Sequence, residues 1–482
     1  MAAVLGVDSS TQSTKVVVVD LDAGEERARG SAPHPATAPP VSEQSPEAWW
    51  DALVSAVGGL DTDLGDVVAM AVGGQQHGLV LLDERDSVIR PAKLWNDTTS
   101  ADDAARLVAD LGPAVWAAAC GSVPVASFTI SKLAWVAEHE PETMRRVRRV
   151  MLPHDYLTWR LTGGHVTDRG DASGTGWFDP ATNRYRRDLL DPVVDSPEQF
   201  VHCLPEVLGP REAAGEISGP AAEALGLRRS VVVAAGTGDN MAAALGLGLR
   251  TGDVAMSLGT SGTVYSVSDT PTADPTGLVA GFADAAGGFL PLACTLNATR
   301  VTDTVAGWLG LDAPGLDALA ADADIGFDGT ILVPYFDGER TPNLPDAAGS
   351  FHGLRTSTSR AALARAAHDG VLCGLFGGLD ALRAAGVAAD GRLHLIGGGA
   401  RAATYRQRAA DLSGVTVVVP EADEVVALGA AVQAAATHSQ APAASFVEPW
   451  RLGAGPVVEP RDVDGGRAVR RAYAAIAARE LG

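Results

Sequence analysis

A short motif of small and hydroxyl-bearing residues occurs twice in this chain, once in each half. The first copy is VDSSTQSTK at residues 7–15, and the second is MSLGTSGTV at residues 256–264. Aligned without gaps, Asp8 falls on Ser257, Thr11 on Thr260 and Thr14 on Thr263. β-Branched residues flank both copies, which predicts two strands joined by a tight turn. Self-similarity at so long a period predicts a fold built from two similar halves.

Turns of this composition are suited to binding an anion, because they offer backbone N–H groups and hydroxyls without bulky side chains. A single copy is more typical of an ordinary surface hairpin. Two copies in one chain favour a more specific interpretation. We expect the two halves to hold one phosphate-bearing ligand from opposite sides.

Strands and helices alternate along the chain, which predicts an α/β fold. Strands are expected at 67–72, 231–235 and 393–396, and the two hairpins add antiparallel strands, so the sheets should be mixed. Residues 31–45 are predicted to be loop, and the helix over 360–385 is expected to break near Gly377 and Gly378. The pattern restarts near residue 236. The predicted domains are therefore 1–236, 237–440 and a C-terminal extension, 441–482.

The composition argues against several classes of protein. The formal net charge of −22 disfavours nucleic-acid binding and docking on an anionic membrane. The four cysteines, Cys120, Cys203, Cys294 and Cys373, form no C-x-x-C pair, so neither a zinc site nor a disulfide framework is expected. No uninterrupted apolar stretch of ~20 residues occurs, and the N-terminus does not resemble a signal peptide. These features predict a cytoplasmic protein.

Two aspartates stand where chemistry is expected. Asp239 follows the strand at 231–235 and two glycines, at the carboxyl end of a strand, where open α/β sheets bind ligands. It could accept a proton from a substrate hydroxyl, or it could simply cap the next helix. Asp8 ends a strand at the first turn, and a carboxylate beside a polyphosphate is normally there for Mg²⁺. Lys15 lies nearby and is open to a phosphate-binding or a plain surface role.

Polar residues cluster with an indole at Gln75-Gln76-His77 and Trp95-Asn96-Asp97. This mixture is typical of polyol binding, in which hydroxyls bond to polar groups and a C–H face lies on an aromatic ring. His77 could equally be a structural histidine. The glycines at 397–399, before Ala400, would let a flat nucleoside lie against backbone, although such runs also form plain strand–helix turns.

Taken together, these motifs resemble the FGGY family of carbohydrate kinases, and within it the xylulose kinase branch. The matching segments run in order over nearly the whole chain: 8–15, 42–50, 74–78, 94–97, 128–135, 152–157, 238–240, 257–263, 334–342, 349–354 and 395–401. The segments at 42–50, 74–78 and 94–97 favour the xylulose branch over the glycerol and gluconate branches. One departure is Gln76, where many xylulose kinases carry Met; it leaves the choice between D-xylulose and D-ribulose open.

The resemblance implies two actin-like ATPase (ribonuclease H-like) domains around a central cleft. It implies that Asp239 is the general base for the terminal sugar hydroxyl and that Asp8 helps to hold Mg²⁺. Sugar contacts would come from Gln76, His77, Trp95, Asp97, Asp239 and Asn240. ATP contacts would come from Thr11, Gln12, Ser13 and Lys15 of the first turn, Gly259 and Thr260 of the second, and Gly398, Gly399 and Ala400.

The resulting hypothesis is ATP- and Mg²⁺-dependent phosphorylation of D-xylulose to D-xylulose 5-phosphate, with no nucleic-acid or membrane partner and a homodimer left open. Two alternatives remain. One is a kinase of another pentulose or polyol, such as D-ribulose or L-ribulose. The other is a non-catalytic actin-fold ATPase that closes on nucleotide without regard to any sugar.

Overall fold

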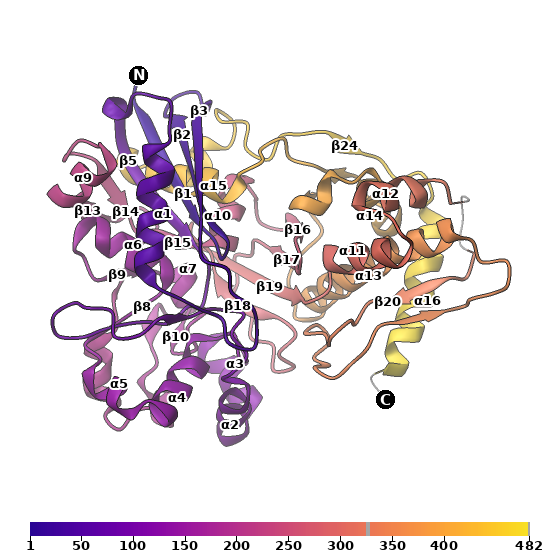
Figure 1. Cartoon of the computed structure of the whole chain (residues 1–482), viewed down its shortest axis with the longest axis horizontal. Coiled ribbons are helices and arrows are strands. Elements are labelled where there is room, and N and C mark those ends of the chain that lie inside the picture. Colours follow the sequence, from indigo (N-terminus) through magenta and orange to yellow (C-terminus); the bar gives the residue numbers. More distant parts are fainter. Residues whose placement is uncertain (324–327, 481–482) are drawn as a thin grey trace. The chain divides into compact units, whose positions relative to one another are not determined.

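The computed structural model describes residues 1–323 and 328–480 and divides into two compact units, each assembled from separate stretches of chain. Unit 1 comprises Met1–Leu249, Asp269–Leu290 and Ala422–Leu452. Unit 2 comprises Arg250–Ser268, Pro291–Glu421 and Gly453–Gly482. The colours of Figure 1 show this interleaving, since the yellow-orange helix α15 lies among indigo strands. The bounds of these units differ from the domain boundaries predicted at 236/237 and 440/441. Those boundaries remain a prediction about domains along the sequence.

A mixed sheet forms the centre of unit 1, with strand order β13-β14-β5-β1-β2-β3. The bounds are Ala213–Glu216, Val232–Ala234, Val67–Gly74, Ala3–Ser9, Ser13–Asp20 and Glu26–Pro33, respectively. Strands β1, β2 and β3 form an antiparallel meander, whereas β5 runs parallel to both β1 and β14. The short strand β15 (Thr237–Gly238) also pairs with β5, at Gly73 and Gly74.

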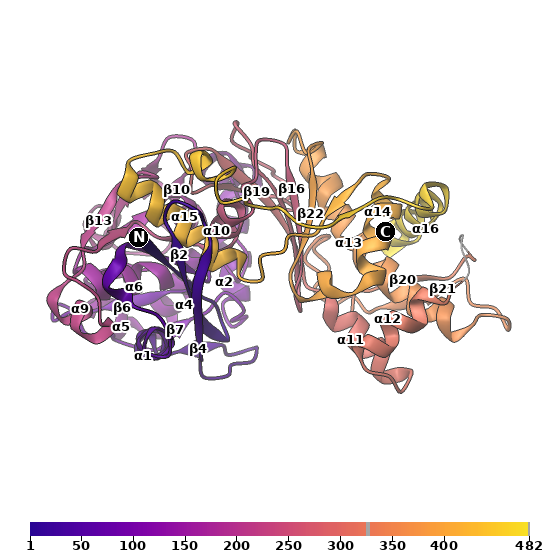
Figure 2. The same cartoon turned by 90° about the horizontal axis from the view of Figure 1, so that it is seen from above.

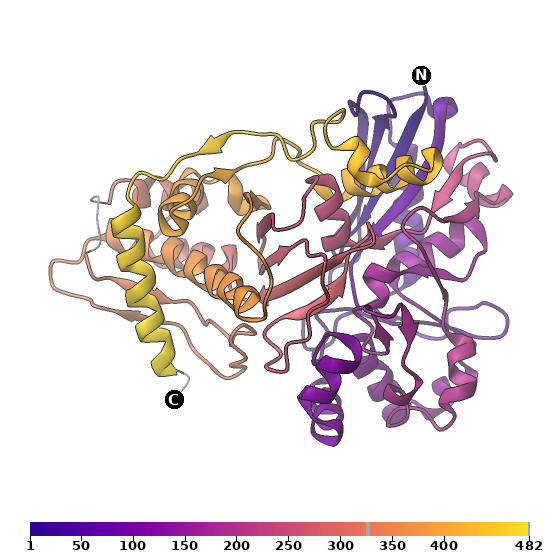
Figure 3. The ribbon, with the colours of Figure 1, turned by 180° about the vertical axis from the view of Figure 1, so that it is seen from behind.

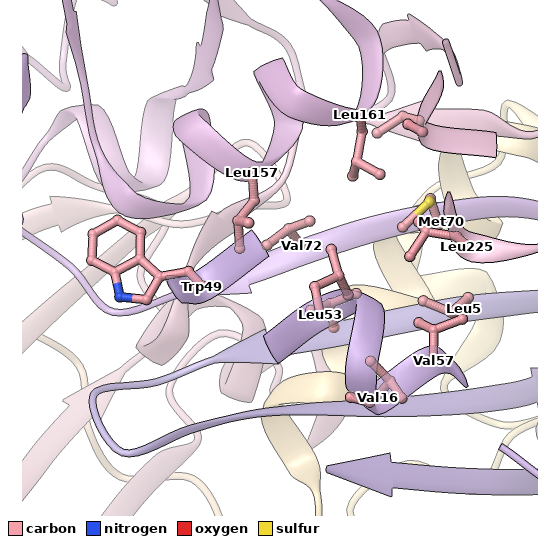
Figure 4. Close-up of a cluster of buried hydrophobic side chains, with 14 of the residues drawn as sticks. Leu5, Val16, Trp49, Leu53, Val57, Met70, Val72, Leu157, Leu161 and Leu225 are labelled. Carbon is pink, nitrogen blue, oxygen red and sulfur yellow. The ribbon is translucent and has the colours of Figure 1, made fainter. Parts of the chain in front are cut away.

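One face of this sheet carries a hydrophobic core. Alternate residues of β1, β2 and β5 point towards helices α1 (Pro46–Gly58), α6 (Pro153–Thr162) and α9 (Gly219–Leu225), as the period of two along a strand requires. Figure 4 shows Leu53 and Val57 of α1 near Leu5 and Val16 of the sheet, with Trp49 of α1 at the other end of the cluster. All five side chains are buried, so this face fixes α1 against the strands.

The other face is covered by α10 (Asp239–Gly246) and α15 (Val425–Ser439), which pack closely against each other (Figure 2). Glycines make this possible: a Cβ on Gly6 would lie 1.9 Å from the carbonyl oxygen of Ala427, and one on Gly429 would lie 1.7 Å from that of Ala242. Helix α15 thereby packs directly on the sheet, and α10, which begins at Asp239, packs closely against α15.

The sheet of unit 2 repeats the plan of the first. Six successive strands of this sheet, after β18, follow the order β19-β17-β16-β22-β23-β24. Their bounds are Phe289–Thr295, Gly262–Ser266, Val254–Leu258, Leu393–Ile396, Val417–Val418 and Val457–Val458. Starting from β3 in one sheet and β19 in the other, the successive pairings are antiparallel, antiparallel, parallel, parallel and antiparallel in both. The predicted α/β fold with mixed sheets and two similar halves is confirmed.

Helices α11 (Thr299–Trp308), α12 (Ala313–Ala321), α13 (Arg360–Ala384), α14 (Ala403–Ser413) and α16 (Val463–Glu480) complete unit 2. Helix α16, the yellow helix near the C label in Figure 3, packs on α14. The break expected in α13 at Gly377 and Gly378 is wrong, because the helix is continuous. Gly378 instead allows close packing on the sheet, where a Cβ would lie 3.2 Å from the Cβ of Ala293.

Both predicted hairpins are present, as β1–β2 and β16–β17, but their turns differ by one residue. Ser9 pairs with Thr14 in the first, and Leu258 pairs with Gly262 in the second. The gapless alignment of Thr14 with Thr263 is therefore wrong structurally. Because the second turn is shorter by one residue, Thr14 corresponds to Gly262. The loop predicted over 31–45 is also partly wrong, because β3 extends to Pro33 and β4 (Glu43–Gln44) lies within it.

The remaining strands are β6 Val80–Leu82, β7 Ala92–Lys93, β8 Arg149–Met151, β9 Val166–Asp168, β10 Phe178–Asp179, β11 Arg184–Tyr185, β12 Glu206–Leu208, β18 Ala280–Ala283, β20 Ile331–Val333 and β21 Ser350–His352. The remaining α-helices are α2 Ala101–Leu111, α3 Pro113–Cys120, α4 Thr129–His139, α5 Pro141–Arg146, α7 Arg169–Ala172 and α8 Pro197–Phe200. Within the described residues, a helix with the length and apolarity needed to cross a bilayer is not found.

Candidate functional site

The proposed base and a proposed sugar ligand meet where β5 and β15 end side by side. Because β15 pairs with β5 at Gly73 and Gly74, Asp239 follows one strand just where Gln76 follows the other. Asn240 links them: its Nδ2 donates to Gln76 Oε1 at 2.9 Å and to Asp239 Oδ1 at 2.9 Å. Gly238, not Asp239, is the N-cap residue of α10, so the interpretation of Asp239 as a helix cap is wrong.

Asp239 is partly exposed, yet the pKa of its carboxyl group is higher than that of an aspartate in water. Burial raises its pKa to about 6, against two hydrogen bonds from Asn240 that oppose the rise. A carboxylate with a pKa just below neutrality is ionised at neutral pH and still basic enough to take a proton from a hydroxyl.

Asp8 lies in β1, opposite Lys15 in β2, and its side chain is buried. Burial raises its pKa to about 7; the charge of Lys15 opposes this, and the negative charges of Asp239 and Glu424 add to it. Within the described part of the chain, its Oδ1 is a buried oxygen without a hydrogen-bond partner. The Nζ of Lys15 lies 2.7 Å from Oε2 of Glu424, at the start of α15.

The first turn is held from three other segments of unit 1. The Thr11 hydroxyl donates to Gln75 Oε1 at 3.1 Å and accepts from Trp95 Nε1 at 2.9 Å. The Thr11 carbonyl accepts from Gln44 Nε2 at 3.0 Å. Within the turn, Ser10 donates to the Ser13 carbonyl through both its N–H and its hydroxyl. Thr11 is thus fixed, while the side chain of the next residue, Gln12, is exposed.

The side chains of His77 and Asp97 in unit 1 are each held by several contacts. His77 has a positive φ of 66°, contacts the Gly174 carbonyl through Nδ1 at 2.8 Å and stacks on Phe128 at a centroid distance of 5.0 Å. Asp97 is fully buried, accepts from the Ser42 N–H at 2.8 Å and lies 3.1 Å from Lys93 Nζ. Its carboxylate is therefore engaged in structural bonds, and its role as a sugar ligand remains a prediction.

The second turn and the glycine run belong to unit 2. Thr299, the first residue of α11, donates its N–H and its hydroxyl to the Gly259 carbonyl at 3.0 and 2.9 Å. The N–H of Ala298 donates to the Thr260 carbonyl at 3.3 Å. Strand β22, next to β16, delivers the glycine run to the same end of the sheet.

The first two glycines of that run differ in their surroundings. Gly397 has a φ of 87°, and a Cβ there would lie 2.7 Å from the carbonyl oxygen of Leu258. By contrast, a Cβ on Gly398 would meet no atom within 4 Å. Gly398 therefore presents open backbone, as a site for a flat ligand needs, whereas Gly399 and Ala400 are buried.

The structure thus brings together Asp8, Thr11, Gln76, Trp95, Asp239 and Asn240 within unit 1, and Gly259, Thr260 and the glycine run within unit 2. Sequence reasoning missed Gln44, Glu424 and Thr299, which support the turns or pair with Lys15. They lie in segments distant from their partners; Gln44 falls within the family-like segment 42–50, but that pattern did not identify it as a contact of the first turn. A pocket of about 650 Å³ also occurs in unit 1, lined among others by Glu47, Arg90, Tyr156, Trp159 and Arg160, but none of the predicted site residues lines it.

A metal at Asp8 is consistent with the residues present. The unpartnered, buried Oδ1 is a hard oxygen donor of the kind that Mg²⁺ prefers. The described residues contain no group of three or more His, Cys, Asp and Glu side chains suited to a metal. Any Mg²⁺ here would consequently depend on few protein ligands, as Mg²⁺ bound together with substrate phosphates does.

Comparisons with known proteins cover almost the whole chain. The model of the N-terminal domain of the FGGY family of carbohydrate kinases matches residues 3–246, and that of the C-terminal domain matches 254–438. A xylulose kinase of Streptomyces coelicolor is 50% identical over 95% of this chain and 92% of its own, and one of Streptomyces rubiginosus is 49% identical with the same coverage. The crystal structure of a xylulose kinase from Bifidobacterium adolescentis superposes with a TM-score of 0.84 at 42% identity, covering 99% of both chains.

Proposed function

Because the chain belongs to the FGGY family of carbohydrate kinases, we propose that it transfers the γ-phosphoryl group of ATP to the 5-hydroxyl of D-xylulose. The enzyme class, a carbohydrate kinase, follows from the family and its relatives. The proposal of D-xylulose rests on relatives that bear the name xylulose kinase. The observation that carries the reaction is the Asp239–Asn240–Gln76 cluster, in which a basic carboxylate lies near the buried Nε2 of Gln76, an amide nitrogen that makes no hydrogen bond within the described residues.

Asp239 takes the proton of the sugar hydroxyl as that oxygen attacks the phosphorus. Asn240 donates to Asp239 Oδ1 through both its N–H and its Nδ2, so the carboxylate is oriented before substrate arrives. Phosphoryl transfer depends mainly on positioning and charge neutralisation, with little covalent chemistry for the protein to do. Correct orientation of the base is therefore a substantial part of what this chain supplies.

Gln76, His77 and Asn240, with Trp95 and Asp97, contact the pentulose in this proposal. The Nε2 of Gln76 is buried and, in the described part of the chain, makes no hydrogen bond, so it can donate to a sugar oxygen. The other end of the same amide is fixed by Asn240 at 2.9 Å. A fixed donor facing the sugar favours one arrangement of hydroxyls over another.

The phosphates of ATP bind both turns: Thr11, Gln12, Ser13 and Lys15 from the first, and Gly259 and Thr260 from the second. Gly398, Gly399 and Ala400 contact the adenosine. Asp8 holds Mg²⁺, which neutralises charge that develops on the transferred phosphoryl group. Lys15, which pairs with Glu424 at 2.7 Å, would exchange that partner for a phosphate oxygen.

A coupled assay of ADP release across D-xylulose, D-ribulose, L-ribulose, glycerol and gluconate tests the substrate. We expect D-xylulose to give the highest kcat/KM. A higher value with D-ribulose would identify the alternative pentulose kinase, which the amide at Gln76 makes the second candidate. ATP hydrolysis that no sugar accelerates would contradict kinase activity and favour the non-catalytic actin-fold ATPase.

The role of Asp239 is tested by Asp239→Asn, which keeps the shape of the side chain and removes the base. We expect kcat to fall by ~10²–10⁴, the usual cost of losing a general base, while Mg-ATP binding by calorimetry is retained. Asp110→Asn, an exposed carboxylate of α2, is the matched control. Near wild-type turnover by Asp239→Asn would show that another group takes the proton.

A further inference from the structure

A histidine surrounded by three carboxylates lies beneath the end of β5, in unit 1. His154 of α6 is fully buried, and its Nδ1 lies 2.8 Å from Asp171 Oδ2. Its Nε2 lies 3.1 Å from Asp155 Oδ1 and 3.9 Å from Asp168 Oδ1. Burial opposes a positive charge on the ring, yet the three carboxylates together raise the pKa of His154 to about 9. The raised pKa favours the charged form of the ring, which Asp171 of α7 and Asp168 of β9 approach from other elements.

His154 is packed directly against the two strand ends that carry the proposed base and sugar ligand. A Cβ on Gly74 would lie 2.9 Å from the Cβ of His154, and one on Gly236 would lie 2.6 Å from its Cδ2. Gly74 comes two residues before Gln76, and Gly236 comes three before Asp239. Gly236 thus lies against the imidazole ring and Gly74 against the backbone and Cβ of His154, in both cases without room for a side chain.

One carboxylate of the cluster bonds to the segment that leads to the base. The Thr237 hydroxyl donates to Asp168 Oδ2 at 2.7 Å. Asp168 also accepts the N–H groups of Gly170 and Asp171 at 2.9 Å each, so it caps the short helix α7. The position of Thr237, and with it the start of α10, is therefore set by α7.

The turn after α7 contacts His77, the other proposed sugar ligand. The Gly174 carbonyl lies 2.8 Å from His77 Nδ1, and a Cβ on Gly174 would lie 2.5 Å from that ring. Residues 168–174 thus touch His77 at one end and Thr237 at the other. Asp171 lies between, and its bond to His154 attaches this segment to α6.

We propose that His154 is a positioning residue for phosphoryl transfer, which through Asp171 and the segment 168–174 holds His77 and Asp239 in register with one another. The inference rests on the proposed function, because the roles of His77 and Asp239 come from it. His154 itself contacts no substrate and acts only through those two residues. Active-site groups must be held closely for catalysis, and a displacement of ~1 Å can cost ~10² in rate. A buried ion pair spanning two elements is suited to this, since its geometry is strict.

The test is His154→Gln, which keeps a polar side chain and removes the charge, with His368→Gln as the control. His368 is also a buried histidine in a helix, contacting the Ala364 carbonyl at 2.9 Å, and it lies in unit 2. We expect His154→Gln to bind Mg-ATP with unchanged stoichiometry and affinity, to raise the KM for D-xylulose and to lower kcat per binding site by ~10–100-fold. His368→Gln should leave both kinetic constants near wild type.

A merely structural role gives a different result. In that case, the stoichiometry of Mg-ATP binding falls with the folded fraction, while kcat per binding site and KM stay unchanged; this would overturn the proposal. If His154→Gln fails to fold, Thr237→Val removes only the hydroxyl that bonds Asp168, and we expect it to lower kcat per site by ~5–10-fold. Wild-type kcat in folded Thr237→Val would equally overturn the proposal.

Failure of the proposed function is distinguishable from failure of this inference. If the wild-type protein phosphorylates no pentulose, the function itself is wrong. If the wild type is active, Asp239→Asn is inactive and His154→Gln matches the wild type, then only the positioning role of His154 is wrong.

Discussion

The acid limb of the pH profile reports on Asp239. Burial raises its pKa to about 6, and the base must be ionised to accept a proton, so activity is lost as pH falls through that value. At saturating Mg-ATP, we expect kcat/KM for D-xylulose to be level from about pH 7 upward and to drop about tenfold per unit below pH 6. A level profile down to pH 4.5 would contradict the assignment of Asp239 as the base.

Asp8 adds a second, metal-dependent titration. Its pKa is raised to about 7, mainly by burial, and a cation on Oδ1 favours the ionised form. We expect the Mg²⁺ concentration for half-maximal activity to rise as pH falls from 8 to 6, because protons compete with the metal. Asp8→Asn should require more Mg²⁺ and lose this pH dependence. An unchanged Mg²⁺ requirement in Asp8→Asn would place the metal elsewhere.

Site residues that directly follow a recognisable strand and turn could be predicted from sequence. The side chains that contact them could not, because they come from distant segments. Asp239 follows a buried strand and two glycines, so its position at the sheet edge was predictable. Its neighbour Gln76 comes from a segment far back in the chain, and the Asn240 amide that joins them follows only from the pairing of β15 with β5. Glu424, which pairs with Lys15, is more distant still.

Among the elements, the glycines of helices divide into two kinds that sequence cannot distinguish. Gly429 in α15 allows contact with α10, where a Cβ would lie 1.7 Å from the Ala242 carbonyl oxygen. Gly377 in α13 is exposed, and a Cβ there would meet no atom within 4 Å. Sequence reasoning treated Gly377 and Gly378 as a helix break, because glycine disfavours helices. Packing by the rest of α13 overrides that preference.

Alanine substitution separates the two kinds. We expect Gly429→Ala to lower the free energy of unfolding by ~1–3 kcal/mol, because the added methyl forces α15 away from α10. Gly377→Ala should raise it by roughly 0.5–1 kcal/mol, since it reduces the entropy of the unfolded chain without a clash. Denaturant melts followed by circular dichroism measure both. A stabilising Gly429→Ala would show that the two helices are not in close contact.

Edge strands set another limit on prediction. Strand β3, Glu-Arg-Ala-Arg-Gly-Ser-Ala-Pro, lacks an apolar run because it lies at the edge of the sheet and is largely accessible. Its pairing with β2 is what completes the three-stranded meander that β19 matches in unit 2. The duplicated turns were enough to predict two similar halves, but the full correspondence of six strands appears only in the pairing pattern.

For the whole molecule, the division of the chain into two units predicts which backbone segments each substrate protects from amide hydrogen exchange. All proposed sugar contacts lie in unit 1, whereas the proposed nucleotide contacts lie in both units. Amide hydrogen exchange detects this, since a bound ligand suppresses local opening of the backbone it contacts. D-Xylulose alone should slow exchange most at residues 74–78 and 237–241. Gluconate at the same concentration should not.

Nucleotide should give a two-part pattern. With Mg²⁺ and a non-hydrolysable ATP analogue, we expect slower exchange at both turns, residues 9–13 and 258–262, and at residues 397–401. Asp239→Asn should leave this pattern intact, because the base is not proposed to contact nucleotide. Protection of only one turn would mean that the two hairpins, although matched in sheet position and in composition, do not share a ligand. The duplicated motif would then reflect only the shared strand order of the two sheets, and not binding of the same ligand by both turns.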